Sequence, residues 1–468
     1  MKRLETDEIK AYLEEYHRAN QIPGLQVCVY EGGEPVFCQS YGVKNCAGDP
    51  LQNDTIMGIA SITKTITALA FSLLCSQGKA SVFDPVIRYF PELKIPGTPA
   101  ESLLVGHLLN HTSGIPALTL HSWCVLEHTE PDEWEKEIFE AIRGSVTWKS
   151  DCTQDIVRYL SSSGAYEPLG QPGMYFSYLN EGYALIAAII ESVSGMPYEA
   201  FVRQQIFSPL EMIRSAFGHK GKENVTSLFL SVDGPISDSW YCAPPYLGTG
   251  YAVSTAEEIA RLLSVLSAGG LYKGKQVFPR DAVELLFGEA FPLSEQGVYC
   301  YGLHKRKKDG SVLLRHNGAL KGVTSTAGFA AGSGRSYAIL ANIEGAHIDE
   351  AENAIQNWIV NAPLDAKPYT PAPLAGQTPR NAAAYAGSFF TMEDMGYSIE
   401  VRIQDNKMTC VFGSAVGGAS GEISFLYCGT TVFVEETGRA HKRVLSFYFD
   451  QDMAIGVQYG GRFFQRRK

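Results

Sequence analysis

The character of the sequence changes near residue 363, and this change constrains the fold more than any other feature. Up to residue 362 the chain mixes apolar helical patterns with short β-type runs, and beyond residue 380 it alternates apolar and polar residues without helical periodicity. Five prolines fall within residues 363–379, a composition typical of an extended linker. We therefore predict a first domain over residues 1–362, a linker over 363–380 and a second domain over 381–468.

The first domain is predicted to have an α+β fold. Strand-like runs gather at its two ends, early around the hairpin signal Glu31–Glu34 and late between residues 298 and 342. Helical patterns accompany them, and this distribution is typical of a layered α+β architecture. Helices are expected at residues 6–20, 59–75, 101–110, 181–194, 254–268 and 348–361.

Three local features add detail to this domain. Ser254 followed by Glu257 forms a capping box, which predicts Ser254 as the N-cap of its helix. The basic run Lys305–Lys308, followed by Asp309 and Gly310, is interpreted as a solvated hairpin turn.

Residues 117–170 carry three tryptophans and many charges with weak helical patterning at 131–142 and 153–162. Such insertions often cover an active-site mouth and set substrate choice, but a cap with no selective role is equally compatible.

The second domain is predicted to be a small antiparallel β-barrel. Its short alternating runs are separated by Gly, Asp and Asn at regular spacing, as in closed all-β folds. The strands are expected at residues 397–403, 407–412, 422–427, 431–434, 444–449, 454–459 and 462–465.

Composition narrows the classes of function. The formal net charge is −11, which argues against binding to nucleic acid or to an anionic membrane surface. No apolar run reaches the roughly eighteen residues that a membrane span needs, and the charged N-terminus lacks a signal-peptide core. We expect a cytoplasmic protein whose ten scattered cysteines are reduced, and we expect neither a metal nor a cofactor.

The stretch Met57–Thr65 contains a serine and a lysine with the spacing of a nucleophile and its base. Ser61 and Lys64 are predicted to lie in the first turn of the 59–75 helix, where residues three apart share one face. A lysine with a lowered pKa can take the serine proton, and the helix N-terminus favours a developing anion. Because Ser-x-x-Lys also occurs by chance, the pair needs support from the rest of the chain.

Tyr178 and Asn180 are the first candidates for that support. They come just before the 181–194 helix, where Tyr178 can pass protons and Asn180 can hold a substrate amide or orient Lys64. The alternative is that Tyr178 is a packing tyrosine in a chain that has 24 of them.

His316, Gly318 and Ala319, at the end of a predicted strand, are the second candidates. Gly318 allows a ligand close to the backbone, and the Ala319 N–H can point at an oxyanion. His316 can hydrogen-bond a substrate or tune the Tyr178–Lys64 pair, although a histidine satisfied at the surface is the alternative.

Taken together, these residues resemble the three motifs of the serine β-lactamase and penicillin-binding-protein superfamily, in the family order: Ser61-x-x-Lys64, Tyr178-x-Asn180 and His316-x-Gly318. The sequence is most similar to the branch of class C β-lactamases, family VIII esterases and D-aminopeptidases, over residues 8–360. The resemblance implies an antiparallel sheet flanked by helices, plus an all-helical region. The segment that opens with Tyr385–Phe389 is similar to the lipocalin-like barrel of some members.

By this resemblance, Ser61 is the acylated nucleophile, Lys64 its base and Tyr178 a proton shuttle or the alternative base. The N–H groups of Ser61 and Ala319 form the oxyanion hole, while the residues expected to contact substrate are Asn180, His316 and Gly318. His316 stands where β-lactamases usually have a lysine, which is the pattern of esterases, aminopeptidases and some acyltransferases. Efficient β-lactam hydrolysis is therefore not expected.

The function implied is that of a serine acyl-enzyme hydrolase of esterase or amidase type, acting on a small-molecule or peptidyl ester, thioester or amide. An acyltransferase, or a stand-alone thioesterase or cyclase of a biosynthetic pathway, would use the same acyl-enzyme and stays open. A non-catalytic binding protein that retains the fold is the alternative from a different class.

Overall fold

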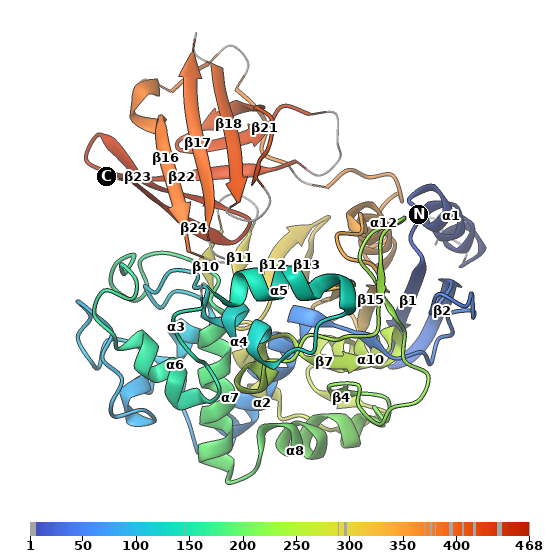
Figure 1. Ribbon diagram of the computed structural model, residues 1–468. Coiled ribbons are helices and arrows are strands. Elements are labelled where there is room, and N and C mark those ends of the chain that lie inside the picture. Colours follow the sequence, from blue (N-terminus) through green and yellow to red (C-terminus); the bar gives the residue numbers. More distant parts are fainter. Residues whose placement is uncertain are drawn as a thin grey trace.

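An eight-stranded antiparallel sheet forms the centre of the first part of the chain (Figure 1). The computed structural model describes residues 6–144, 146–288, 290–293, 297–368, 370–374, 377–379, 381–392, 396–404, 407–414, 418–437 and 442–467. The strands follow the spatial order β10 (Phe291–Pro292), β11 (Val298–Tyr299), β12 (His304–Lys308), β13 (Ser311–Leu320), β14 (Val323–Ala330), β15 (Arg335–Ala341), β1 (Gly24–Glu31) and β2 (Glu34–Gly42).

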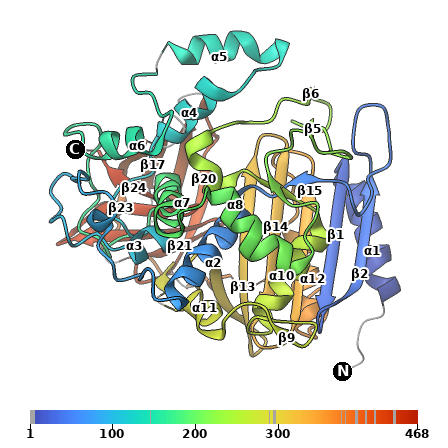
Figure 2. The ribbon, with the colours of Figure 1, turned by 90° about the horizontal axis from the view of Figure 1, so that it is seen from below.

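Helices cover both faces of this sheet, as Figure 2 shows. Because side chains alternate along a strand, Val27 and Val29 of β1 pack with helices α1 (Thr6–Ala19) and α12 (Asp349–Ile359) in one apolar cluster. Cys28 and Tyr30 face the other way, into the larger cluster that includes helix α10 (Ala256–Ser267). The predicted α+β fold is confirmed.

A region made of helices lies beside the sheet, and two long buried helices form its centre. Helix α2 (Thr63–Ser76) is buried from Thr63 to Leu74, and it packs against α7 (Asn180–Ser194). The surrounding helices are α3 (Val105–Leu109), α4 (Leu120–His128), α5 (Lys136–Arg143), α6 (Thr153–Leu160), α8 (Tyr198–Val202) and α11 (Arg280–Leu285). No single helix among the described residues is long and apolar enough to span a membrane, although α7 and the segment Tyr198–Leu210 would pass that test together as a bent pair.

The C-terminal part is a closed eight-stranded antiparallel barrel, as predicted. Strand β17 pairs with both β16 and β18, which closes the sheet on itself. Aromatic residues such as Phe389, Phe433 and Phe447 fill its interior. The strands are β16 (Gly387–Thr391), β17 (Tyr397–Gln404), β18 (Lys407–Ser414), β20 (Ile423–Gly429), β21 (Val432–Glu435), β22 (Val444–Asp450), β23 (Met453–Tyr459) and β24 (Arg462–Arg466), with β19 (Gly418–Ala419) added beside β18.

The barrel lies over the edge of the sheet that carries β10 and β11 (Figure 1). Aromatic contacts join the two parts, since the Tyr175 ring lies 4.7 Å from that of Phe463. In the predicted linker, the Leu374 N–H donates to the Tyr427 carbonyl of the barrel. The boundaries at residues 362 and 380 stay predictions.

One of the local predictions was wrong and another was confirmed in part. The basic run forms strand β12, which pairs with β13, and Asp309 and Gly310 make the hairpin turn between them. The run is not simply solvated, since Lys308 bonds Asn353 and Arg306 bonds Gln356, both on helix α12. The N-cap of α10 is Thr255, whose side chain accepts from the Glu258 N–H, while the Ser254 hydroxyl bonds Ser215 instead. For the N-cap, the distant partner Ser215 decided the outcome.

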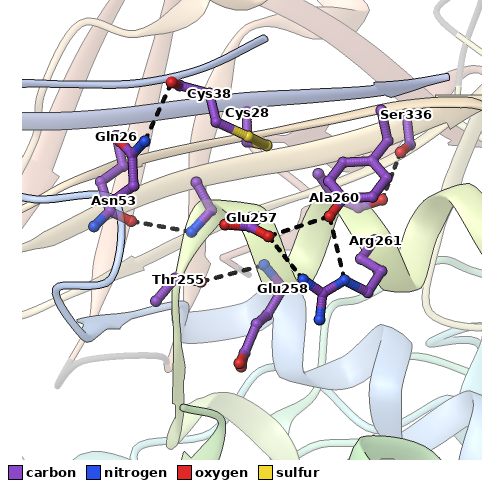
Figure 3. Close-up of a disulfide and its surroundings, with 12 residues drawn as sticks. Gln26, Cys28, Cys38, Asn53, Thr255, Glu257, Glu258, Ala260, Arg261 and Ser336 are labelled. Carbon is purple, nitrogen blue, oxygen red and sulfur yellow. Dashed lines mark hydrogen bonds and ion pairs between the residues drawn. A yellow bond between two sulfur atoms is a disulfide. The ribbon is translucent and has the colours of Figure 1, made fainter. Parts of the chain in front are cut away.

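The expectation that all cysteines are reduced was also wrong. Cys28 and Cys38 form a disulfide across strands β1 and β2, as Figure 3 shows. The two residues are direct cross-strand partners with Cα atoms 4.1 Å apart, a register that periodicity alone does not reveal. The other eight cysteines, all within the described residues, form no disulfide.

Candidate active site

The turn that carries Ser61 is held in an unusual backbone conformation. Ser61 lies in a 3-10 turn (Ala60–Ile62) ahead of α2, rather than in the first turn of the α-helix as predicted. Ala60 has a φ of +44°, which is costly for a residue with a Cβ atom. Thr63 stabilises this conformation, since its hydroxyl donates to the Ala60 carbonyl and accepts from the Ala252 N–H. The strain falls on the residue just before the predicted nucleophile.

Lys64 is fully buried and its amine points at Ser61. The Nζ atom lies 3.4 Å from Ser61 Oγ, 2.9 Å from Asn180 Oδ1 and 2.8 Å from the Thr249 carbonyl oxygen. Asn180 Oδ1 and the carbonyl only accept hydrogen bonds, so they take two of the amine hydrogens. In a neutral amine, the remaining lone pair would face the Ser61 hydroxyl.

Tyr178 lies against the same amine. Its ring centroid is 4.7 Å from Lys64 Nζ and 4.9 Å from the guanidinium carbon of Arg462, a residue of the barrel. The Tyr178 N–H donates to the Gly461 carbonyl at 2.9 Å. Gly460 and Gly461 form the two-residue turn between β23 and β24, where both have a positive φ. The barrel therefore contributes directly to the surroundings of the tyrosine.

Gly318 on β13 lies against the backbone of the Ser61 turn. A Cβ atom built there would lie 2.8 Å from the Ser61 nitrogen and 2.7 Å from the Ile59 carbonyl oxygen. Strand β12 pairs with β13 only as far as Arg315, so within the described part of the chain no strand pairs with residues 316–320 on that side. The exposed Ala319 follows on this free edge, where the sequence predicts its N–H to be an oxyanion donor.

Replacing Gly318 by alanine is expected to lower the free energy of unfolding by roughly 1–3 kcal/mol and to slow acylation of Ser61, because the methyl group displaces the Ser61 turn. Thermal unfolding and the rate of acylation would be measured together. Gly182→Ala is the matched control, since a Cβ atom at this buried glycine meets nothing closer than 3.5 Å. Equal behaviour of the two variants would contradict the role given to Gly318.

His316 is buried, with both ring nitrogens occupied. Its Nε2 lies 3.0 Å from the Tyr299 hydroxyl and its Nδ1 lies 2.6 Å from the Asn317 carbonyl oxygen. Burial, assisted by the positive charge of Lys64, lowers the pKa of His316 to about 3. A substrate would have to compete for either nitrogen, so this geometry favours tuning of the site, while substrate binding by His316 stays a prediction.

The free energy of unfolding is expected to fall as the pH drops below about 6.5, partly because of His316. Between that pH and about 3, the unfolded chain binds a proton at this histidine and the folded chain does not. His316→Gln should reduce the pH slope of stability by up to about 1.4 kcal/mol per unit, measured by chemical denaturation from pH 7 to 4. His347→Gln, at an exposed side chain, is the control. An unchanged slope in His316→Gln would contradict the buried neutral histidine.

The insertion 117–170 reaches the same edge of β13. Lys321, which is 4% exposed, bonds Glu135 at 2.6 Å and Asp132 at 3.1 Å. This contact attaches the insertion to the β13–β14 turn, and losing one partner would leave a buried charge uncompensated. Lys321 is two residues from the predicted oxyanion donor Ala319 in the sequence, which is compatible with a role of the insertion in substrate choice.

The structure thus brings Ser61, Lys64, Tyr178 and Asn180 together, with Gly318 against the Ser61 backbone. Sequence reasoning missed four residues around them: Thr249, His111, Gly461 and Arg462. The sequence offered two signals: the double glycine at 460–461, as a hairpin turn, and the stretch His107–Pro116, which contains His111 and resembles a fold signature of the family. Across the described ranges, no group of three or more His, Cys, Asp or Glu side chains could hold a metal ion.

The predicted nucleophile Ser61 thus follows a strained residue and lies next to a buried lysine and a tyrosine, a geometry suited to serine acyl chemistry. The family model described as "Beta-lactamase" matches residues 9–362. The chain therefore belongs to the beta-lactamase family, whose members are serine hydrolases.

Individual relatives agree with this assignment. Penicillin-binding protein 4* of Bacillus subtilis strain 168 is 30% identical over 213 residues, which cover 45% of this chain and 42% of that protein. The match thus spans less than half the length of this relative. Among solved structures, that of SurE with D-Leu has a TM-score of 0.72 at 20% identity over 99% of both chains. The D-amino acid amidase of Ochrobactrum anthropi SV3, complexed with L-phenylalanine amide, has a TM-score of 0.56 at 23% identity over 72% of this chain and 91% of its own. Both structural likenesses concern the fold.

Proposed function

We propose that the protein is a serine hydrolase of amidase or esterase type that works through an acyl-enzyme on Ser61. The observation that carries this proposal is the position of Lys64 Nζ, which lies 3.4 Å from Ser61 Oγ while two acceptors hold it from other directions. A buried amine fixed in this way is suited to accept the serine proton and serves no evident packing purpose.

The reaction follows from these positions. Ser61 Oγ attacks the substrate carbonyl as its proton passes to Lys64, and the carbonyl oxygen becomes an oxyanion facing the N–H groups of Ser61 and Ala319. Collapse of this intermediate breaks the bond to the leaving group, which takes a proton through Tyr178. Water then attacks the acyl-enzyme, gives its proton to the same groups, and releases the acid and free Ser61. Every proton released in one step is taken up in another, and no step needs an electron donor or a cofactor.

For the substrate, we propose a small or peptidyl compound with a D-configured residue at the reacting carbonyl. Support comes from the names of the structural neighbours, one solved with D-Leu and one a D-amino acid amidase. The net charge of −11 argues against nucleic-acid and anionic-membrane partners, which leaves a small-molecule or peptidyl substrate as the better fit.

Aminoacyl p-nitroanilides and p-nitrophenyl esters of both configurations would test this proposal. The D-series should turn over faster, and Ser61→Ala should be inactive on every compound. Equal rates for D and L would remove the stereochemical part of the proposal. Turnover by Ser61→Ala equal to that of the wild type would remove the serine mechanism.

Transfer of the acyl group to an amine is a second candidate function, which a cavity of about 380 Å³ favours. Its lining includes the Tyr459 and Phe412 rings and Arg462, whose guanidinium also lies over Tyr178. All the residues that line this cavity belong to the barrel, and Arg462 is its link to Tyr178, so an acceptor larger than water would bind on the barrel side of that arginine. If added amino-acid amides produce no coupled product during turnover, this candidate is wrong.

A further inference from the structure

His111 is a buried residue beside Tyr178 that the mechanism above does not use. Its side chain is 0% exposed, and its backbone has a φ of +59°. Such a conformation is uncommon for a residue with a Cβ atom and marks a position that the surrounding structure dictates. The residue follows helix α3 and faces the segment that leads into α7.

His111 holds that segment on both sides of Tyr178. The Ser177 N–H donates to the His111 carbonyl oxygen at 2.9 Å, and the Leu179 N–H donates to His111 Nδ1 at 3.1 Å. Between them, the Tyr178 N–H donates to Gly461 of the barrel. Three consecutive amides are therefore fixed, and one residue holds two of them.

The imidazole also packs against the tyrosine ring. The centroids of His111 and Tyr178 are 4.2 Å apart, and the rings of Phe176, Tyr183 and Tyr299 lie within 5.7 Å of the histidine. Because Nδ1 accepts a hydrogen bond, the neutral ring carries its hydrogen on Nε2, which has no hydrogen-bond partner among the described residues. Weak contacts between an N–H group and surrounding aromatic rings can offset part of the cost of its missing hydrogen bond.

Burial keeps this histidine neutral. It lowers the pKa of His111 well below the ordinary value, and the positive charge of Lys64 adds to the effect. Protonation would remove the acceptor at Nδ1, so a neutral ring is what the bond from Leu179 requires.

We propose that His111 is the positioning residue that fixes the Tyr178 hydroxyl relative to Ser61 and Lys64, by holding the amides on either side of the tyrosine. This inference rests on the proposed proton-transfer role of Tyr178. A displacement of about 1 Å at a reacting group can cost a hundredfold in rate, so the loss of this hold should slow the reaction without preventing folding.

Two substitutions separate the hydrogen bond from the volume of the side chain. His111→Asn places an acceptor oxygen near the position of Nδ1, and asparagine tolerates a positive φ. His111→Leu fills a similar space but offers no acceptor. Hydrogen exchange of the peptide covering residues 174–180 should accelerate in the leucine variant and stay close to wild type in the asparagine variant. Equal exchange rates in the two variants would contradict the proposal that His111 holds the segment around Tyr178.

The kinetic test is a double-mutant cycle with Tyr178→Phe. His111→Leu alone should lower kcat about tenfold to a hundredfold with little change in KM, and His111→Asn should restore most of it. In the Tyr178→Phe background, His111→Leu should cost no further rate, because its effect passes through the tyrosine. If the rate losses of the two substitutions are additive, His111 has a structural role only and does not position Tyr178.

The two proposals can fail separately. If the wild type neither turns over substrate nor is labelled at Ser61, the proposed function is wrong. Hydrogen exchange still decides whether His111 holds the segment around Tyr178.

Discussion

Replacing Lys64 by methionine should lower the reactivity of Ser61 by about 10²–10⁴-fold, because the variant lacks the amine that is proposed to take the serine proton. Lys64→Arg should be similarly impaired, since a guanidinium keeps the charge but stays protonated. The measurement is the rate of labelling by a fluorophosphonate, followed by mass spectrometry.

The control for this prediction is Lys44→Met. The Lys44 amine also bonds an asparagine, Asn224 Oδ1 at 3.1 Å, but it lies outside the site. Its loss should leave the labelling rate unchanged. If Lys64→Met is as reactive as Lys44→Met, then Lys64 is not the base.

Tyr178→Phe is expected to reduce turnover by about 10²–10⁴-fold while leaving the thermal stability close to that of wild type. The phenylalanine ring keeps the contacts with His111, Lys64 and Arg462, and only the hydroxyl is lost. Steady-state kinetics with the best substrate of the D-series would measure the effect.

Tyr175→Phe provides the comparison for this variant. Tyr175 lies three residues earlier and contacts the Phe463 and Tyr448 rings of the barrel. Its hydroxyl has no place in the mechanism, so turnover should persist. Full activity in Tyr178→Phe would show that the proton passes by another route.

Local periodicity and turn residues predicted the elements that depend on neighbouring residues. Helix α2, helix α7 and the barrel strands follow from apolar patterns that repeat over many positions. The prediction failed where a distant partner competes with the local signal. Ser254 has the chemistry of an N-cap, yet its hydroxyl bonds Ser215, and the next residue caps the helix.

The same distinction applies to the site. Ser61 and Lys64 are three residues apart, and Tyr178 and Asn180 are two apart, so each pair was visible as a motif. The sequence did not reveal the positive φ of Ala60 or the bond from Lys64 to the Thr249 carbonyl. Backbone groups carry no side-chain signature, and their positions depend on packing between elements far apart in the chain.

The barrel shows most clearly what the sequence left open. Its fold was predictable, but its contact with the site was not. The carbonyl of Gly461 meets the N–H of Tyr178 only because the β23–β24 turn reaches the first domain. A segment at the end of the chain thus helps to fix a residue of the predicted mechanism.

The proposed mechanism requires that Ser61 attacks the substrate carbonyl and carries its acyl group. The most direct test is intact-mass analysis of the full-length protein after brief reaction with an activated D-aminoacyl ester, or with a fluorophosphonate that phosphonylates the same nucleophile, followed by peptide mapping. We expect a single adduct on the peptide that contains Ser61, and none in Ser61→Ala. An adduct on another residue, or an equal yield in the alanine variant, would contradict it.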